Sequence, residues 1–248
     1  MGFEMIIECR DIIKKYDELI VINKVNLSVK KGEFVVILGP SGCGKSTFLF
    51  MLAGFEKPSK GKIYIHGKEV KKPGRDRGFV FQEYVLFPWR TVLGNVMSGI
   101  KEKKHRREIA MEYIERVGLT EFANVYPHKL SGGMKQRVSI ARALAYNPEI
   151  LLMDEPFGAL DAQNRKLMQQ ELLKVLRELN KTIVFVTHSV IEAVYLADRV
   201  IVMSKRPAKI IYESEIIFKG DRSYTSGKYL EYRKEILHYL NYETGVKE

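Results

Sequence analysis

The chain has 248 residues, 46% of them hydrophobic and 29% charged, which is the ordinary composition of a globular protein large enough to bury a core. The two cysteines give no disulfide framework and lack the Cys-x-x-Cys spacing of a metal site. The apolar runs are too short for a membrane-spanning helix, and the N-terminus shows no signal-peptide pattern. The formal net charge of +11 leaves open nucleic acid, an anionic surface, an anionic ligand or simply a basic solvated exterior.

Two kinds of strand pattern are present along the chain. Residues 25–29 and 63–65 alternate apolar and polar side chains, which predicts half-exposed antiparallel strands. Continuous apolar runs are typical of strands buried on both faces of a mostly parallel sheet. They occur at residues 34–38, 150–153, 183–186 and 200–203. The sequence therefore predicts a parallel core sheet with a small antiparallel sheet beside it.

Helical patterns separate the buried strands. Apolar residues at helical spacing run from Met168 to Leu179 and again from Tyr229 to Leu240. Residues from about 91 to 146 are mainly helical in pattern and lack strong strand runs. We expect a single α/β domain over residues 1–248, with a core at about 1–90 and 147–248 and an inserted helical subdomain at about 91–146.

The most basic stretch, residues 101–107, comes just before one of these helical patterns. It reads KEKKHRR, and apolar residues follow at Ile109, Tyr113, Ile114 and Val117. No aromatic residues are interleaved with the charges, so the sequence favours a solvated helix over a nucleic-acid patch.

A glycine-rich motif directly follows the buried run at residues 34–38. It matches G-x-x-x-x-G-K-[ST] and lies between a strand and a helical pattern, which is the context of a phosphate-binding loop. Glycines allow the backbone to turn its N–H groups toward phosphate, a lysine adds charge, and a serine can bind Mg²⁺. The residues are Gly39, Pro40, Ser41, Gly42, Cys43, Gly44, Lys45, Ser46 and Thr47. A small filler role is favoured for Cys43, with a reactive thiol as the alternative.

Two acids end the buried run at residues 150–153. A carboxylate at the end of an apolar strand is costly unless a cation or donor compensates, and Mg²⁺ would do so. Adjacent strand residues point in opposite directions. Asp154 is therefore the candidate Mg²⁺ carboxylate, and Glu155 the candidate to polarise an attacking water. The alternative is a solvated turn.

A second anion site is predicted at residues 130–137, LSGGMKQR. Ser131 is a suitable N-cap, and Gly132 and Gly133 expose N–H groups at the positive end of a helix. Together with the phosphate loop, this segment resembles the signature of the ATP-binding-cassette (ABC) family.

The resemblance covers nearly the whole chain, with the family's motifs in order. It implies a P-loop ABC cassette, in which Tyr16 stacks on adenine and Gln82 is the Q-loop glutamine. Asp154 and Glu155 match the Walker B acids, Asp161 matches the D-loop, and His188 matches the switch histidine. Taken singly, Tyr16, Gln82 and His188 are more often packing or surface residues, so their joint order carries the assignment.

The resemblance also implies a mechanism. Two cassettes pack head to tail, so that the phosphate loop of one and Ser131 with Gly133 of the other enclose each ATP. Ser46, Gln82 and Asp154 would organise Mg²⁺, Glu155 would act on water, and His188 would contact the γ-phosphate. Asp161 would cross the dimer interface. ATP would close the dimer and hydrolysis would open it.

Looser signals indicate the class of transporter. Residues 82–92 and 205–208 are similar to the nitrate, sulfonate and taurine importer class, and Phe87 and Trp89 lie either near the groove for the membrane subunit or in ordinary packing. The class implies a peripheral subunit on the cytoplasmic membrane face, with a polytopic permease, indirectly a solute-binding protein, and no nucleic acid as partners. An exporter cassette, a soluble ATPase on nucleic acid or ribosomes, and a regulatory subunit with little turnover are the alternatives.

Overall fold

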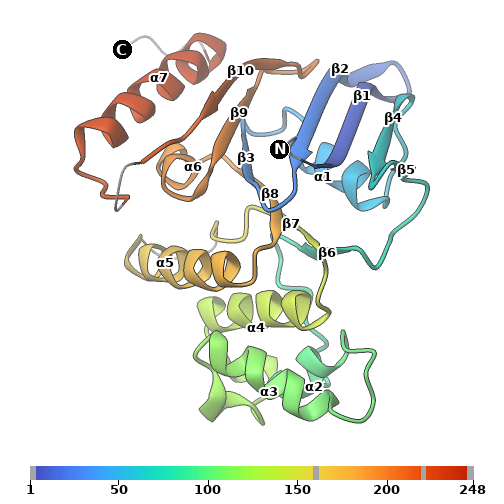
Figure 1. Cartoon of the computed structure of the whole chain (residues 1–248), viewed down its shortest axis with the longest axis vertical. Helices are drawn as coiled ribbons and strands as arrows, with labels where there is room; N and C mark the ends of the chain where they lie inside the picture. Colours follow the sequence, from blue (N-terminus) through green and yellow to red (C-terminus); the bar gives the residue numbers. More distant parts are fainter. Residues whose placement is uncertain (1–3, 159–161, 219–221, 245–248) are drawn as a thin grey trace. The chain divides into compact units, whose positions relative to one another are not determined.

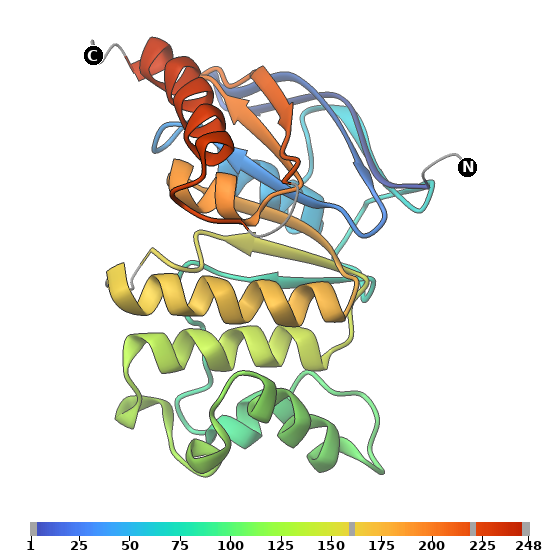
Figure 2. The same cartoon turned by 60° about the vertical axis from the view of Figure 1, so that its left-hand side comes forward.

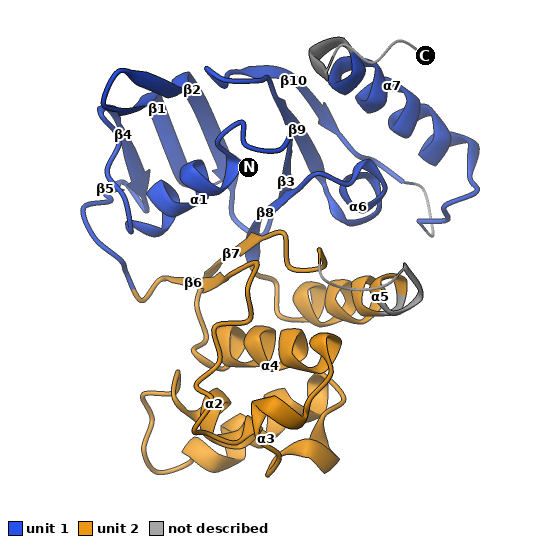
Figure 3. Ribbon diagram, turned by 180° about the vertical axis from the view of Figure 1, so that it is seen from behind, with its two compact units in different colours: residues 1–74, 182–248 blue, residues 75–181 orange. Residues whose placement is uncertain are grey.

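The computed structural model describes residues 4–158, 162–218 and 222–244. The backbone forms two compact units, residues 1–74 with 182–248 (unit 1) and residues 75–181 (unit 2), which Figure 3 draws in different colours. Each unit combines helices with parallel strands, so the predicted α/β class is confirmed.

Unit 1 contains an antiparallel sheet in the order β2-β1-β4-β5. Its strands are β1 (Met5–Tyr16), β2 (Leu19–Lys30), β4 (Lys60–Ile65) and the short β5 (Lys68–Glu69). Figure 1 shows β1, β2 and β4 side by side. In β2, residues 25, 27 and 29 are buried while 26 is exposed, as the alternating pattern predicted.

The second sheet of unit 1 carries the buried strands in the order β10-β9-β3-β8. Every residue of β3 (Phe34–Leu38), β8 (Thr182–Thr187) and β9 (Arg199–Met203) is buried. These three strands are parallel, which confirms the prediction from their continuous apolar runs. β10 (Ile210–Glu215) joins β9 as an antiparallel strand with alternating exposure.

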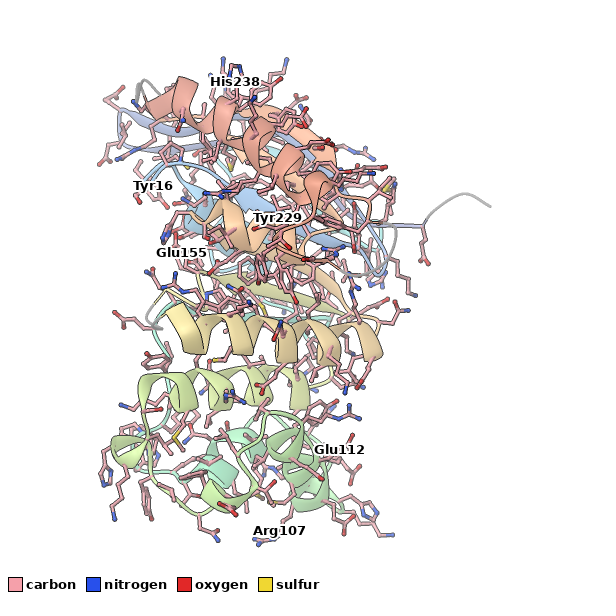
Figure 4. All side chains as sticks on the ribbon, turned by 90° about the vertical axis from the view of Figure 1, so that its left-hand side faces the viewer. Tyr16, Arg107, Glu112, Glu155, Tyr229 and His238 are labelled. Carbon is pink, nitrogen blue, oxygen red and sulfur yellow. The ribbon has the colours of Figure 1, made fainter. Side chains whose placement is uncertain are left out.

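The described residues of unit 1 also form the helices α1 (Lys45–Ala53), α6 (Val190–Leu196) and α7 (Gly227–Thr244). The last helix packs against α6, β9 and β10. Tyr229, labelled in Figure 4, is 2% exposed and donates a hydrogen bond to the carbonyl of Ile191 at 3.3 Å. Tyr239 stacks on Tyr212 of β10 at 4.1 Å, so aromatic side chains fix α7 to the sheet.

Unit 2 begins with β6 (Arg77–Val80), which pairs in parallel with β7 (Ile150–Asp154). Its helices are α2 (Val92–Met97), α3 (Arg106–Arg116), α4 (Gly132–Ala145) and α5 (Ala162–Glu178), with 3-10 turns η1 (Thr120–Phe122) and η2 (Pro127–Lys129). Helices α2, α3 and α4 pack on one another. The helical subdomain expected at about 91–146 stays a prediction; α5 lies outside that range.

Helices α4 and α5 lie side by side in both Figure 1 and Figure 2. Arg137 of α4 joins them, because its guanidinium pairs with Glu171 of α5 at 2.6 Å. The same group donates to the carbonyl of Val117, just after α3, at 2.9 Å. On α3 the charges are solvated, with Arg107 and Glu112 exposed on its surface (Figure 4).

Candidate functional site

The predicted phosphate loop joins β3 to α1 in unit 1, and its glycines have backbone conformations that other residues rarely adopt. Gly42 has φ +71°, and Gly44, the N-cap of α1, has φ +121°. A Cβ at Gly44 would lie 2.8 Å from Cγ1 of Val21, and one at Gly39 would lie 2.9 Å from the carbonyl oxygen of Met203. The glycine positions of the motif therefore follow from steric necessity.

Lys45 is the first residue of α1 and is only 4% exposed. Its ammonium donates to the carbonyl of Gly39 at 2.8 Å and to that of Pro40 at 3.0 Å. The side chain is therefore held folded over the loop, beside the backbone N–H groups at the start of the helix. A buried cation at a helix N-terminus makes this the most favourable anion position of the loop.

Cys43 is buried inside the loop, with 2% exposure. Burial raises the pKa of its thiol, and the nearby Lys45 offsets only part of that rise. A thiol with a raised pKa carries little thiolate at neutral pH. The structure therefore supports the filler role for Cys43 over the reactive one.

His188 leaves β8 next to the phosphate loop. Because Leu38 pairs with Thr187 in the parallel register, Gly39 and His188 are the next residues along the two neighbouring strands. The Thr187 hydroxyl donates to Glu192 at 2.5 Å, and Ser189 caps α6. His188 is exposed between these two fixed neighbours. Unit 1 thus brings the phosphate loop and the predicted switch histidine to the same sheet edge.

Tyr16 ends β1 and is 40% exposed. Its hydroxyl donates to Glu56, and the Lys14 ammonium lies 4.7 Å from the ring centroid. Partial burial raises the pKa of Tyr16, with Glu56 adding to that rise, while a hydrogen bond with Thr47 lowers it. The Thr47 contact places Tyr16 at the first turn of α1, so the predicted base platform and phosphate loop are neighbours.

Unit 2 holds the predicted acids and the Q-loop glutamine at one sheet edge. Val80 of β6 pairs with Met153 of β7, so Asp154, the last residue of β7, and Gln82, two residues past β6, lie at the carboxyl ends of adjacent parallel strands. Asp154 is 4% exposed. Glu155 has φ +41°, which is rare for a residue other than glycine and indicates a strained position (Figure 4).

The predicted signature lies at the start of α4. Ser131 is the N-cap, and its hydroxyl accepts from the N–H of Met134 at 3.3 Å. A Cβ at Gly132, the first residue of the helix, would meet the Tyr84 hydroxyl at 2.8 Å. Gly133 follows in the first turn of the helix. The segment after Gln82 therefore packs directly on the glycine entrance of the signature.

The remaining predicted site residue, Asp161, lies outside the described residues. Gly158 is the last described residue before it, and its N–H donates to the Glu155 carbonyl at 3.0 Å.

A groove of about 820 Å³ opens beside the Q-loop glutamine. Residues 82–86, 88, 127, 128, 135 and 158 line it, all within unit 2. Val85 is 54% exposed, and Trp89 next to the groove is 70% exposed. Trp89 does not line the groove, and its ring packs against that of Phe87 with 5.6 Å between the centroids, so the location of both residues near a membrane-subunit groove stays a prediction.

Three residues of these surroundings were missed by sequence reasoning. Asn95 of α2 is fully buried; its amide donates to the carbonyls of residues 87, 90 and 91 at 3.0 to 3.1 Å, and its oxygen accepts from the N–H of residue 87 at 2.8 Å. No local sequence pattern predicts that Asn95 holds the segment beside the groove. The position of Lys14 could have been found from the sequence, because residues i and i+2 of a strand lie on one face and Lys14 is two residues before Tyr16. Glu56 had none, because it is distant in sequence from Tyr16.

Parallel strands with a glycine loop running into a helix define a P-loop nucleotide-binding fold. Residues 22–158, more than half of the chain, match the family model described as ABC transporter. The chain belongs to this family, as one of its ATP-binding cassettes. No helix in the described part of the chain is sufficiently long and apolar to span a membrane.

Curated relatives match over most of the chain. An uncharacterized ABC transporter ATP-binding protein of Methanocaldococcus jannaschii is 54% identical over 90% of this chain and 85% of the relative. A nitrate import ATP-binding protein of Synechocystis is 44% identical over 91% of this chain and 86% of its own length. An aliphatic sulfonates import ATP-binding protein of Bacillus cereus is also 44% identical, with coverages of 90% and 89%.

Solved structures share the fold. A dimeric bacterial ABC transporter cassette superimposes with a TM-score of 0.76 at 37% identity, covering 86% of this chain and 99% of that one. The cassette cbiO1 of Clostridium perfringens, part of the transporter complex cbiONQ, gives 0.80 at 27% identity, with coverages of 98% and 96%. The predicted ABC cassette fold, its ATP binding and its place among transport ATPases are thereby confirmed.

Proposed function

We propose that this cassette hydrolyses ATP to drive a membrane importer of small anionic or vitamin-like solutes. The observation that carries the proposal is the phosphate loop, with Lys45 buried at the start of α1 beneath two loop carbonyls. The importer direction is supported by the nitrate and sulfonate import relatives. The solute itself is recognised by other subunits in such systems, so its chemical class rests on those relatives alone.

The nucleotide is held by two elements of unit 1. Tyr16 supplies a surface on which adenine stacks, and the loop from Gly39 to Thr47 surrounds the phosphates with N–H donors. Lys45 exchanges its carbonyl partners for phosphate oxygens and neutralises their charge. His188, next to the loop in register, contacts the terminal phosphate from the adjacent strand.

The hydrolytic groups are acids and amides suited to a hard metal ion. Ser46, Gln82 and Asp154 offer a hydroxyl, an amide and a carboxylate. These are oxygen donors, which Mg²⁺ prefers, whereas zinc is bound mainly by nitrogen and sulfur. Bound Mg²⁺ supplies charge neutralisation to the phosphates. Glu155, the residue after Asp154, accepts a proton from the attacking water.

Two copies of the cassette complete each nucleotide site. Ser131, Gly132 and Gly133 present the N-terminus of α4, a helix of 14 residues, to the phosphates bound by the partner copy. Asp161 acts across the same interface. Because ATP brings negative charge between two positive sites, it closes the dimer, and hydrolysis with product release opens it. The dimeric solved cassette supports this arrangement.

The groove beside Gln82 receives a helix of a polytopic permease. Val85, which lines the groove, exposes an apolar side chain that suits such an occupant, and the exposed Trp89 follows the lining residue Pro88 in the sequence. This attachment places the cassette at the cytoplasmic face of the membrane as a peripheral subunit, with a solute-binding protein acting indirectly through the permease.

The decisive experiment is recovery of the chain from its native cells in mild detergent, with mass spectrometry of what accompanies it. We expect a stoichiometric polytopic membrane protein. Val85→Asp, on the groove rim, should lower its recovery while ATP binding is unchanged. Phe122→Asp, an exposed apolar position of unit 2 that does not line the groove, is the matched control and should behave as wild type.

Recovery of ribosomes, nucleic acid or only soluble proteins would contradict the transporter assignment and leave the ATPase standing. Equal recovery with both variants would contradict the role of the groove. An exporter permease among the recovered proteins would overturn the import direction alone.

A further inference from the structure

The ring of Tyr16 is held by two charged side chains from different parts of unit 1. Lys14 places its ammonium over one face of the ring, 4.7 Å from the centroid. Glu56 accepts the hydrogen bond of the Tyr16 hydroxyl and also pairs with the Lys14 ammonium at 3.1 Å. Each of the three side chains therefore contacts the other two. We refer to Lys14, Tyr16 and Glu56 as the Tyr16 cluster.

Burial shows which side of the ring remains open. The Lys14 side chain is 13% exposed and that of Glu56 is 31% exposed, whereas Tyr16 is 40% exposed. An ammonium this far buried requires compensation, which it receives from the ring, the carboxylate and the carbonyl of Lys57 at 3.0 Å. Because the largely buried Lys14 covers one face of the ring, the face left for a ligand is the opposite one.

The cluster also connects the ring to the phosphate loop. α1 begins in the loop at Lys45 and ends at Ala53, with Gly54 as its C-cap at φ +81°. Glu56 follows this cap, and its N–H donates to the carbonyl of Phe50 in α1 at 3.4 Å. The end of the helix that starts at the phosphate loop therefore positions the carboxylate that holds the Tyr16 hydroxyl.

We propose that Lys14 and Glu56 are positioning residues for the nucleobase, which hold the Tyr16 ring so that one face meets the purine at a fixed place relative to the phosphate loop. The inference rests on the stacking role proposed for Tyr16. A ring fixed before binding loses little freedom when the base stacks, which favours affinity. A cation on the covered face also draws electron density away from the open face. This reduces the repulsion between the ring electrons and those of a stacked base.

The test separates base contacts from phosphate contacts. Binding of ATP and of inorganic tripolyphosphate is measured calorimetrically with wild type, Lys14→Met, Lys14→Arg and Lys15→Met. Lys15 is the matched control, because it is the next residue of β1, carries the same charge and is exposed. We expect Lys14→Met to weaken ATP binding roughly 3- to 10-fold and to leave tripolyphosphate unchanged. Lys14→Arg should stay near wild type, and Lys15→Met should change neither ligand.

Glu56→Gln provides a second, isosteric variant, which keeps an acceptor for the Tyr16 hydroxyl but loses the charge that pairs with Lys14. We expect it to weaken ATP roughly threefold, again without an effect on tripolyphosphate. An equal loss for both ligands with either variant would overturn the proposal, because it would indicate general disruption of unit 1.

A double-mutant cycle with Tyr16→Ala tests whether Lys14 acts through the ring. In the Tyr16→Ala background, Lys14→Met should cause no further loss of ATP affinity. A full additional loss there would overturn the positioning role while leaving the Tyr16 platform intact. If Tyr16→Ala alone binds ATP as tightly as wild type, the proposed stacking role fails, and this inference with it.

Discussion

The substitution Gly44→Ala tests whether nucleotide affinity depends on the backbone conformation of the phosphate loop and not only on its charge. Gly44 has φ +121°, a region that L-residues rarely adopt. The added methyl group would lie 2.8 Å from Cγ1 of Val21 and 3.3 Å from Cγ1 of Ile22. Both neighbours are buried and β-branched, so neither can rotate away at low cost.

The two effects give the magnitude. A non-glycine residue at such a φ costs about 1–3 kcal/mol, and an overpacked methyl group adds about 1–3 kcal/mol. We therefore expect the free energy of unfolding in urea to fall by about 2–6 kcal/mol. Gly67→Ala is the matched control: Gly67 has φ +70°, but no atom lies within 4 Å of its added methyl group. Only the backbone cost, about 1–2 kcal/mol, is expected there.

Gly44→Ala should weaken nucleotide binding as well as lower stability. Strain at Gly44 is relieved by moving the loop, which displaces N–H donors and Lys45 from the phosphates. ATP affinity, measured by calorimetry under folding conditions, should fall at least about 10-fold with Gly44→Ala and stay unchanged with Gly67→Ala. Wild-type affinity and stability in Gly44→Ala would refute the steric reasoning.

Three further expectations concern other parts of the chain. Arg199→Met breaks a bidentate ion pair with Glu33 at 2.7 and 3.0 Å and a hydrogen bond to Glu213 at 2.6 Å. The free energy of unfolding in urea should therefore fall by about 3–5 kcal/mol. A fall of less than about 1 kcal/mol would show that these contacts contribute little to stability. Asn95→Ala leaves three carbonyls without their amide donor and should cost about 2–4 kcal/mol in the same assay, whereas a neutral result would show that the segment beside the groove is held otherwise. Because burial raises its pKa, Cys43 should react with iodoacetamide at pH 8 far more slowly than a free thiol; rapid stoichiometric modification would refute its burial.

The fold was predictable where side-chain burial is uniform along an element. The continuous apolar runs gave β3, β7, β8 and β9, because strands buried on both faces require apolar residues throughout. Strands β6 and β10 escaped prediction. β6 begins with an arginine and a glycine, and β10 has an apolar start followed by the alternating sequence ESE, so neither stands out from a loop.

The candidate site also contains residues that the sequence could predict and residues that it could not. The phosphate loop was predictable because its glycines, lysine and serine are contiguous, and the physical requirement for each is local. The Tyr16 cluster was not, because Lys14 and Glu56 meet only through the turn that follows α1. Asn95 shows the same limit, since its hydrogen bonds to the preceding loop depend on a tertiary path that no periodicity encodes.

Glu155→Gln, measured with Mg-ATP, tests the proposed hydrolytic role most directly. The substitution preserves shape and removes only the carboxylate that accepts the proton from water. We expect ATP to bind with wild-type affinity, turnover to fall at least about 100-fold, and an ATP-bound dimer to accumulate on size-exclusion chromatography. Near-normal turnover in Glu155→Gln, or failure of the wild-type cassette to bind ATP, would contradict the proposed mechanism.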